Sequence, residues 1–479
     1  MIRRLRRAGL AGACAALLAG CNLGPHYARP RLEIPAAFRA TPATAAAAWP
    51  APDWWRAFGS AELDALMQAA EVQNFDIAAA IARVRQADAQ VRIAGAPLLP
   101  AVSATGSDTW SKASTQRGGS GFSSFGGRGS DQSREYSLAL NVSYELDFWG
   151  KNRAALQAAR ATALFSRFDQ QTVALTVLAG VATSYFTALA LQDRLAVAER
   201  NLADANDSLN VIRGRLSVGT ATALDLAQQE ALVAGVRASI PALRSQLEQE
   251  VIGLGILVGR PPEAIQIAAG TLNAMPLPVV VPGLPSALLA RRPDVAAAEA
   301  QLIAANANIR SARAAFFPSI QLTGSGGWQS LALTTLFGPG ATAASLAGSF
   351  TQTLFDNGLL AGQLGNAKGR YDELLADYRK AVVQAFTDVE NALTALRYAT
   401  EQEALERDAV ATAQRAADIA RAQLAAGTVD VTTVLTAEQT LFTDEDTLAQ
   451  VRLARFDALV NLYKALGGGW QQPTETASE

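Results

Sequence analysis

The strongest constraint on the fold is that one long stretch of sequence occurs twice. Residues 76–80 (Asp-Ile-Ala-Ala-Ala) return as residues 294–298 (Asp-Val-Ala-Ala-Ala), an offset of 218. Two glycine landmarks are instead 208 residues apart, Gly150 with Gly358 and Gly219 with Gly427. The difference falls in a Gly- and Ser-rich loop at 111–130, which is longer than its counterpart around 329–344. A period of about 210 residues is far longer than a solenoid repeat and predicts a duplicated, domain-sized element.

Each copy contains a pattern typical of a β-hairpin. Residues 137–147 alternate between apolar and polar side chains, and residues 346–354 alternate more weakly. Weaker strands are expected just before each loop, at 101–109 and 319–328. Strands of about ten residues suit a tilted membrane crossing. A soluble hairpin with one solvated face remains an alternative on this feature alone.

Long helices are expected after each hairpin. Proline is absent from Lys151 to Ile240 and from Gly340 to Gln472, in a chain with 19 prolines. As one helix, residues 151–218 would be about 100 Å long. Gly219 and Gly427 are expected to end these helices, and they occupy equivalent positions in the two copies. Return helices are expected at 222–257, interrupted near Pro241, and at 432–466.

The number of strands predicts an assembly. Two hairpins supply four strands, whereas a membrane barrel needs at least eight, because an open sheet edge in lipid leaves backbone groups unpaired. Several copies of the chain are therefore needed to close a barrel. Apolar side chains of the strands would face lipid, and Ser, Thr and Asn would face a wet lumen.

The N-terminus indicates export and a lipid anchor. Four arginines precede a short apolar stretch that ends in Leu17-Leu18-Ala19-Gly20-Cys21, as in a bacterial lipoprotein signal. Cys14 leaves with the signal peptide, so Cys21 has no disulfide partner in the mature chain. Asn22 follows Cys21, and the sorting rule for lipoproteins then implies the outer membrane. An ordinary signal peptide with an incidental cysteine is the alternative.

Composition argues against several other functions. The formal charge is -2 and only 18% of residues are charged, without the basic excess of nucleic-acid-binding proteins. One His, two Cys and three Met leave little material for a metal centre or for His-based catalysis. No nucleophile cluster or phosphate-binding loop is recognisable. We therefore expect no enzyme activity, no cofactor, no metal and no nucleic acid.

Six short motifs occur in the order found in a known family: Cys21–Tyr27 with Arg29-Pro30, Trp54-Trp55 with Phe58, Tyr144–Lys151, Leu257–Pro261, Arg291–Val295 and Ala315–Ile320. With them the chain resembles, over nearly its whole length, the TolC/OprM-type outer-membrane factors, in particular the lipoprotein (NodT-type) branch of resistance-nodulation-division efflux systems. The resemblance implies a homotrimer with a twelve-stranded β-barrel, a mainly α-helical periplasmic tunnel and an equatorial belt. It also implies passive export of drugs or other small molecules delivered by an inner-membrane pump and a periplasmic adaptor. The alternative is the adaptor itself, although that class normally has one helical hairpin.

This interpretation divides the chain into six segments: a signal peptide (1–20), a lipid-anchored segment with part of the belt (21–60), a first repeat (61–274) with its hairpin at about 101–147, a linker (275–290), a second repeat (291–466) with its hairpin at about 319–355, and a C-terminal tail near the belt (467–479). Trp54 and Trp55 are expected to pack in the belt. Asp147 is expected either in the lumen or at the start of the following helix.

The turns between the long helices are the candidate functional sites. By the resemblance, acidic and bulky apolar side chains near these turns close the channel at rest, which makes Asp430, Leu424 and Asp225 the candidate gate residues. The adaptor-docking tips would be Val218, Gly219, Thr220, Gly427 and Thr428. Plain structural roles remain open for all of them: a solvated turn aspartate, a packing leucine and helix-ending glycines.

Overall fold

The computed structural model describes residue 24 and residues 27–39, 49–112, 132–280 and 285–470. It forms two compact units, which are described separately. The first comprises Met1–Pro30, Arg85–Leu164 and Ala300–Ala376, and the second comprises Arg31–Val84, Phe165–Glu299 and Asp377–Glu479. The first unit holds a β-sheet, and the second holds the turns between the long helices and an aromatic core.

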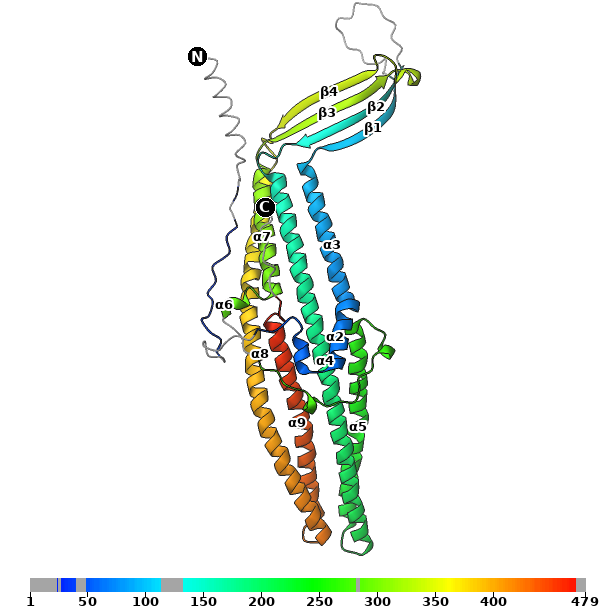
Figure 1. Cartoon of the computed structure of the whole chain (residues 1–479), viewed down its shortest axis with the longest axis vertical. Helices are drawn as coiled ribbons and strands as arrows, with labels where there is room; N and C mark the ends of the chain where they lie inside the picture. The colour runs from blue at the N-terminus through cyan, green and yellow to red at the C-terminus, as the bar shows by residue number, and fades with distance from the viewer. Residues whose placement is uncertain (1–23, 25–26, 40–48, 113–131, 281–284, 471–479) are drawn as a thin grey trace, which may run out of the picture. The chain divides into compact units, whose positions relative to one another are not determined.

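The sheet contains four antiparallel strands in the order β1-β2-β3-β4 (Figure 1). Their bounds are β1 Ala101–Lys112, β2 Gln132–Glu145, β3 Ser319–Ser330 and β4 Thr342–Thr351. Both predicted hairpins are confirmed. The last strand begins and ends earlier than the alternation indicated: its first residue, Thr342, pairs with Trp328, and its last residue, Thr351, pairs with Ser319, where β3 begins.

The two faces of the sheet differ as the sequence predicted. Leu138 lies opposite Gly106 on β1 and Trp328 on β3, on the apolar face. The other face carries hydroxyl pairs between directly opposed serines, at Oγ–Oγ distances of 2.7–2.8 Å: Ser107 with Ser137, Ser111 with Ser133, and Ser325 with Ser345. These pairs satisfy the serine hydroxyls of that face across the strands.

The sheet has two unpaired edges. Among the described residues, β1 pairs only with β2, and β4 pairs only with β3. A sheet edge presents a row of free amide and carbonyl groups that another strand can bind.

The helices include the two very long ones that were expected, α4 and α8. The α-helices are α2 Ala61–Gln73, α3 Phe75–Gly95, α4 Lys151–Ser217, α5 Ala223–Val258, α6 Pro285–Leu288, α7 Pro293–Ala314, α8 Leu359–Ala426 and α9 Val431–Ala465. The 3-10 helices are η1 Trp54–Phe58, η2 Ala96–Leu98, η3 Pro262–Ala264, η4 Leu272–Ala274 and η5 Leu333–Thr335. Asp147 accepts hydrogen bonds from the amides of Asn152 and Arg153, at 3.0 and 2.8 Å, so it stabilises the start of α4.

The expected interruption at Pro241 is wrong, because α5 runs through it without a break. A proline removes one amide donor and disturbs one turn, at a cost of about 3 kcal/mol. Pro241 itself is exposed, while Ile240 and Leu243 beside it are buried against Leu191 and Ala198 of α4. Packing on both sides of the proline therefore holds the helix together.

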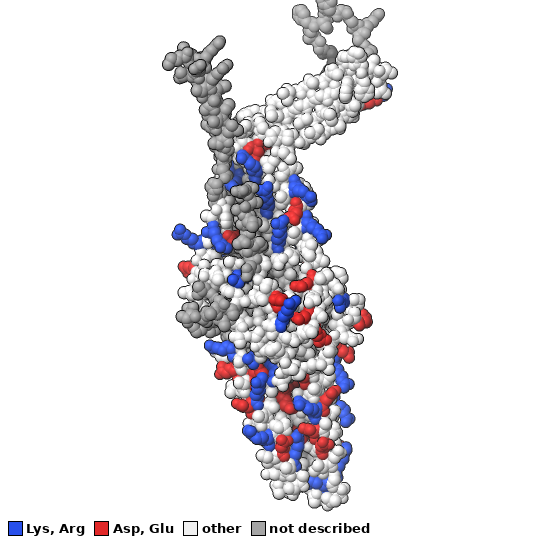
Figure 2. Space-filling model, viewed as in Figure 1, with Lys and Arg blue, Asp and Glu red and all other residues white. Residues whose placement is uncertain are grey.

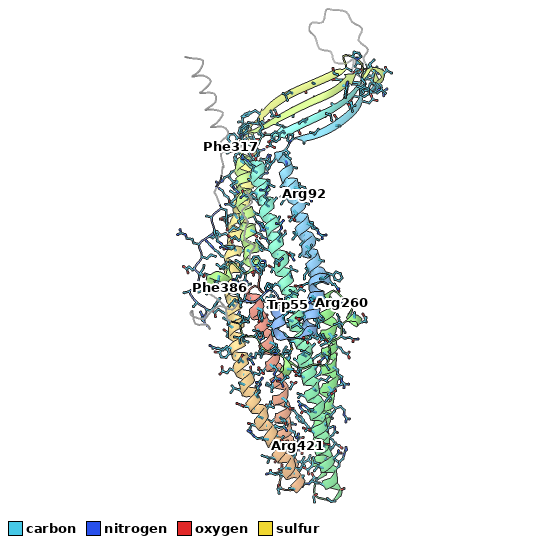
Figure 3. The ribbon with its side chains drawn as sticks, viewed as in Figure 1. Trp55, Arg92, Arg260, Phe317, Phe386 and Arg421 are labelled. Carbon is cyan, nitrogen blue, oxygen red and sulfur yellow. The ribbon has the colours of Figure 1, made fainter. Side chains whose placement is uncertain are left out.

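The core of the second unit is aromatic. Trp54 stacks on Tyr463 with ring centres 4.8 Å apart, and Phe186 lies 4.9 Å from both Phe58 and Phe456. Trp55 is also buried in this core (Figure 3). The packing role predicted for the two tryptophans is confirmed.

One helix, α4, is long and apolar enough to qualify as a membrane span by length and composition alone. Its residues at 177–190 instead supply much of the aromatic core, and 56% of its most apolar window is buried within the chain. Its hydrophobicity is explained by packing against α2, α5 and α9, as in a core helix of a globular unit.

Candidate functional site

Both helical hairpins end in a glycine with a left-handed backbone. Gly219 has φ 75° and Gly427 has φ 77°. The amides of Thr220 and Thr428 donate to the carbonyls of Arg215 and Gln423, at 2.8 and 3.0 Å, which closes the last turns of α4 and α8. The helix-ending role of the two glycines is confirmed. Val218, 72% exposed, is the largest apolar side chain that the first turn presents.

The two candidate gate aspartates both cap a helix. Asp225 accepts from the amide of Thr222 at 2.7 Å and completes a reciprocal capping box at the start of α5. Asp430 accepts from the amide and the hydroxyl of Thr433, at 2.8 and 2.7 Å, at the start of α9. These hydrogen bonds, the hydroxyl first, hold the pKa of Asp430 below its ordinary value. Asp430 is exposed and stays anionic at neutral pH.

Leu424 lies inside the turn and not on its surface. Its side chain is 2% exposed and packs in a small cluster, which also contains Ile212, Ala420, Val431, Val434 and Leu435. α4, α8 and α9 close around it, so its side chain is not presented on the surface of the single chain. We do not retain it as a gate residue, because its packing role accounts for it.

A buried carboxylate links four helices close to the turns. Glu438 on α9 is fully buried and accepts from Ser208 Oγ of α4 at 2.6 Å and from Arg421 Nε of α8 at 2.9 Å. Gln229 of α5 donates to the other carboxylate oxygen at 3.4 Å. Arg421, labelled near the end of α8 in Figure 3, also pairs with Asp204 of α4 at 3.1 Å. Burial opposes the charge of Arg421, but the hydrogen bond to Glu438 and the charges of Glu438, Asp204 and Asp418 together outweigh burial and raise the pKa of this guanidinium.

The two turns are joined directly by Arg215. Its Nη1 donates to the carbonyl of Leu424 at 2.6 Å, and its Nη2 donates to the carbonyl of Thr220 at 3.2 Å. No motif in the sequence predicted this link or the Glu438 network. The only available signal was an acid in an apolar helical stripe, since Val434, Leu435 and Leu441 share a face with Glu438.

A second buried carboxylate, Glu403, lies in the middle of α8. Glu403 is 1% exposed and accepts from three arginines: Arg407 Nη2 at 2.6 Å, Arg452 Nε at 3.1 Å and Arg455 Nη1 at 2.8 Å. Burial alone would raise the pKa of Glu403, but the arginines outweigh burial and lower it. The cluster joins α8 to α9.

The family model for outer membrane efflux proteins matches residues 66–260 and again residues 284–468. The chain belongs to this family. The two matches begin 218 residues apart and end 208 residues apart, the same offsets as in the sequence, which confirms the duplication.

Relatives of this outer membrane efflux protein cover almost the whole chain. The pyoverdine export outer membrane protein OpmQ of Pseudomonas aeruginosa is 39% identical over 468 residues, which is 98% of each chain. The cation efflux system protein CusC of Escherichia coli K12 is 31% identical over 95% of this chain and 98% of its own. The solved structure of the outer-membrane channel OprN superposes with a TM-score of 0.86 at 27% identity, over 94% of this chain and 100% of that one.

The efflux protein is therefore an outer-membrane channel component that extends into the periplasm, and the predicted main function is confirmed. The adaptor alternative is set aside, because the matched relatives are outer-membrane channels. Within the described residues, no group of three or more His, Cys, Asp and Glu side chains is placed to hold a metal ion.

A partly buried carboxylate of this efflux protein predicts a dependence of stability on pH. Burial raises the pKa of Asp457 on α9 to about 6, and the charge of Glu250 on α5 adds to the rise. One of its carboxylate oxygens is buried and has no hydrogen-bond partner among the described residues. Because the unfolded pKa is about 3.9, the folded state binds this proton more tightly. The free energy of unfolding should therefore fall as the pH rises from about 4 to about 6. Above about pH 6 the full loss of stability from ionised Asp457 should remain.

The Asp457→Asn variant should remove this penalty. We expect an increase of about 2 kcal/mol in the free energy of unfolding at pH 7.5, and almost none at pH 4. The measurement is the midpoint of thermal unfolding in detergent at both pH values, with the exposed Glu401→Gln as control. An equal effect of Asp457→Asn at both pH values would contradict the titration of Asp457 as the cause.

Proposed function

We propose that three copies of this chain close a twelve-stranded barrel in the outer membrane, which the long helices continue as a periplasmic tunnel. The observation that supports this is the sheet with one apolar face, one hydroxyl face and free edges at β1 and β4. Such a sheet is stable in lipid only when its edges are paired, and pairing β4 of each copy with β1 of the next leaves no edge.

The assembly is the exit duct of a tripartite pump, with a periplasmic adaptor and an inner-membrane resistance-nodulation-division pump as partners. The relatives named above are export and efflux proteins. Transport through such a duct is passive and makes or breaks no bond, so no catalytic group and no cofactor are needed. The serine pairs make the hydroxyl face of the sheet polar, which suits a wet lumen for small molecules. The exposed turns at Val218, Gly219, Thr220, Gly427 and Thr428 are the proposed adaptor-docking tips.

The experiment is the mass of the protein extracted from outer membranes, measured by light scattering with correction for bound detergent. Three chains per particle are expected, and a monomer that leaves the membrane without detergent would refute the proposal.

The free edge of β4 can be tested by substitutions at Ala344. Gln329 donates to the carbonyl of Ala341, and alternation along an antiparallel pair then directs the Ala344 amide away from β3. Ala344→Pro should yield monomers. The chain should still fold, because an edge strand tolerates proline, but proline has no amide hydrogen to donate to the neighbouring copy. Ala344→Gly keeps the amide and should still yield trimers.

Cys21 is proposed as the lipid-anchored N-terminus, which would place the chain in the lipoprotein branch of the family. Cys21 and the neighbouring His26 lie outside the described residues. The support is the sequence alone: once the signal peptide has left with Cys14, no other cysteine remains. Labelled palmitate should be incorporated into the parent protein and not into Cys21→Ser. Incorporation into the variant would refute the anchor.

Asp430 is proposed as a charged ring that restricts the channel at its periplasmic end, and Asp225 as a weaker contributor. Asp430 is exposed and ionised, and three copies would attract cations. Since asparagine is as good a helix cap as aspartate, Asp430→Asn removes the charge and keeps the cap. We expect a higher basal conductance in planar bilayers and lower cation selectivity, with unchanged thermal stability. If the conductance and selectivity of the variant match the parent, Asp430 is a helix cap only.

A further inference from the structure

The loop between β3 and β4 has a defined structure of its own. Ser330 and Thr335 share a hydroxyl hydrogen bond of 2.6 Å, and the Ser330 hydroxyl also accepts from the amide of Ala332 at 3.3 Å. The Gly338 amide donates to the carbonyl of Thr335 at 2.9 Å. These bonds hold the short helix η5 at the end of the hairpin, so the side chains of this loop point in set directions.

This ordered loop presents apolar side chains outward. Leu331, Leu333 and Phe337 are 74%, 62% and 68% exposed, although Leu336 between them is buried. The loop is also free of charge, since no Asp, Glu, Lys, Arg or His occurs between Arg313 and Asp356. A rigid cluster of exposed apolar side chains without charges indicates a surface that is covered in the working protein.

The loop leans toward the apolar face of the sheet. The ring of Phe337 meets the ring of Trp328 edge-on, with centres 5.4 Å apart. Trp328 lies opposite Leu138, on the face that carries Leu140 and Leu322. The apolar surface of the loop is therefore continuous with the apolar face and lies away from the serine pairs.

The described strand ends of the first hairpin are different. On the same apolar face, Asp108 and Arg134 form an ion pair near the outer end of β1 and β2, and Lys112 ends β1. The charges at the end of the sheet in Figure 2 stand out against an otherwise uncharged face. Charged residues at this level mark the headgroup region or water. The end of the second hairpin carries no such residue.

We propose that the β3–β4 loop is a membrane foot: Leu331, Leu333 and Phe337 are inserted among the lipids of the outer leaflet beside the barrel wall. The proposal rests on the barrel proposed above, because a lipid-facing wall is what the loop continues. The occupant is lipid, since the loop is uncharged and its aromatic contact is with the lipid-facing face. Each copy would contribute one such foot to the barrel rim.

The test uses a single fluorophore at Leu333. The chain contains only Cys14 and Cys21, so Leu333→Cys offers a defined thiol for an NBD label, with the labelled parent protein as blank. The labelled trimer is reconstituted in phosphatidylcholine vesicles, with or without lipids that carry a nitroxide near the headgroup end of the chain. Ser325→Cys, on the hydroxyl face, is the matched control.

We expect blue-shifted emission at position 333 and loss of intensity with nitroxide lipids, but little loss with iodide in the water. Position 325 should show the reverse. A label at position 333 that iodide quenches and nitroxide lipids do not would overturn the foot, and would place the loop over the mouth of the pore or in water. Failure of the barrel itself is distinguishable, because it would appear as monomers in the mass measurement.

Discussion

Replacing Gly259 with alanine should severely destabilise the helical core. Gly259 ends α5 with φ 68°, and its amide donates to the carbonyls of Gly255 and Ile256. A side chain there would overlap the carbonyl of Gln73 and press on the amide of Asn74, which are backbone groups and cannot rotate away. The left-handed conformation alone costs a non-glycine residue about 1–2 kcal/mol. Displacing α2 or α5 to make room should bring the total to about 4 kcal/mol.

The matched control for this prediction is Gly427→Ala. Gly427 also ends a long helix with a left-handed backbone, but a side chain there would meet no atom within 4 Å. The free energy of unfolding of Gly427→Ala should fall only by the cost of the left-handed conformation, about 1 kcal/mol. The measurements are the yield of folded protein from the outer membrane and the midpoint of thermal unfolding in detergent. Equal losses in the two variants would show that the close approach to Gln73 is unimportant.

Removing the carboxylate of Glu403 should have the second largest effect. In Glu403→Ala, Arg452 and Arg455 would keep their charges at positions where the side chains are only 11% and 24% exposed, without their counterion. Breaking a buried ion pair in this way costs about 3–5 kcal/mol. Arg407 is 55% exposed and should contribute little. We therefore expect α8 and α9 to separate more readily, with a fall of several degrees in the unfolding midpoint.

The pH dependence distinguishes this mechanism from a simple loss of packing. Because the folded pKa of Glu403 is lowered, its contribution is present above the unfolded value near 4.3 and is lost as the pH falls through the folded value. Glu403→Ala and Glu403→Gln should therefore differ from the parent most at neutral pH and least in acid. The control is Glu401→Ala, on the same helix but exposed. A deficit of Glu403→Gln that persists unchanged in acid would contradict a charge effect.

The secondary structure was largely predictable because it depends on local patterns. The absence of proline over long stretches predicted α4 and α8, and alternation predicted β2, whose apolar face the register confirms. Pro241 shows where local rules fail. The intrinsic cost of a proline argued for a break, but burial of Ile240 and Leu243 against another helix outweighs that cost. No pattern within α5 reports that contact.

The functional residues were harder to predict than the fold. Asp430 was identified from its place in the turn, and the structure adds that it caps α9. Leu424 was proposed for a gate because it is apolar and close to the turn, yet three helices bury it. Glu438 was overlooked because its partners Ser208 and Gln229 lie more than 200 residues away in the chain.

The sequence by itself determined the duplication, the two hairpins, the long helices with their glycine ends, and the family. These features depend on the spacing of side chains along one segment, which backbone geometry converts directly into strands, helices and turns. Only the tertiary structure decided which polar residues are buried together, such as Glu403 with Arg452 and Arg455, and where glycine alone fits, as at Gly259. The reason is physical: burial and close approach are properties of segments that meet in space, and their energies depend on partners that are remote in the sequence.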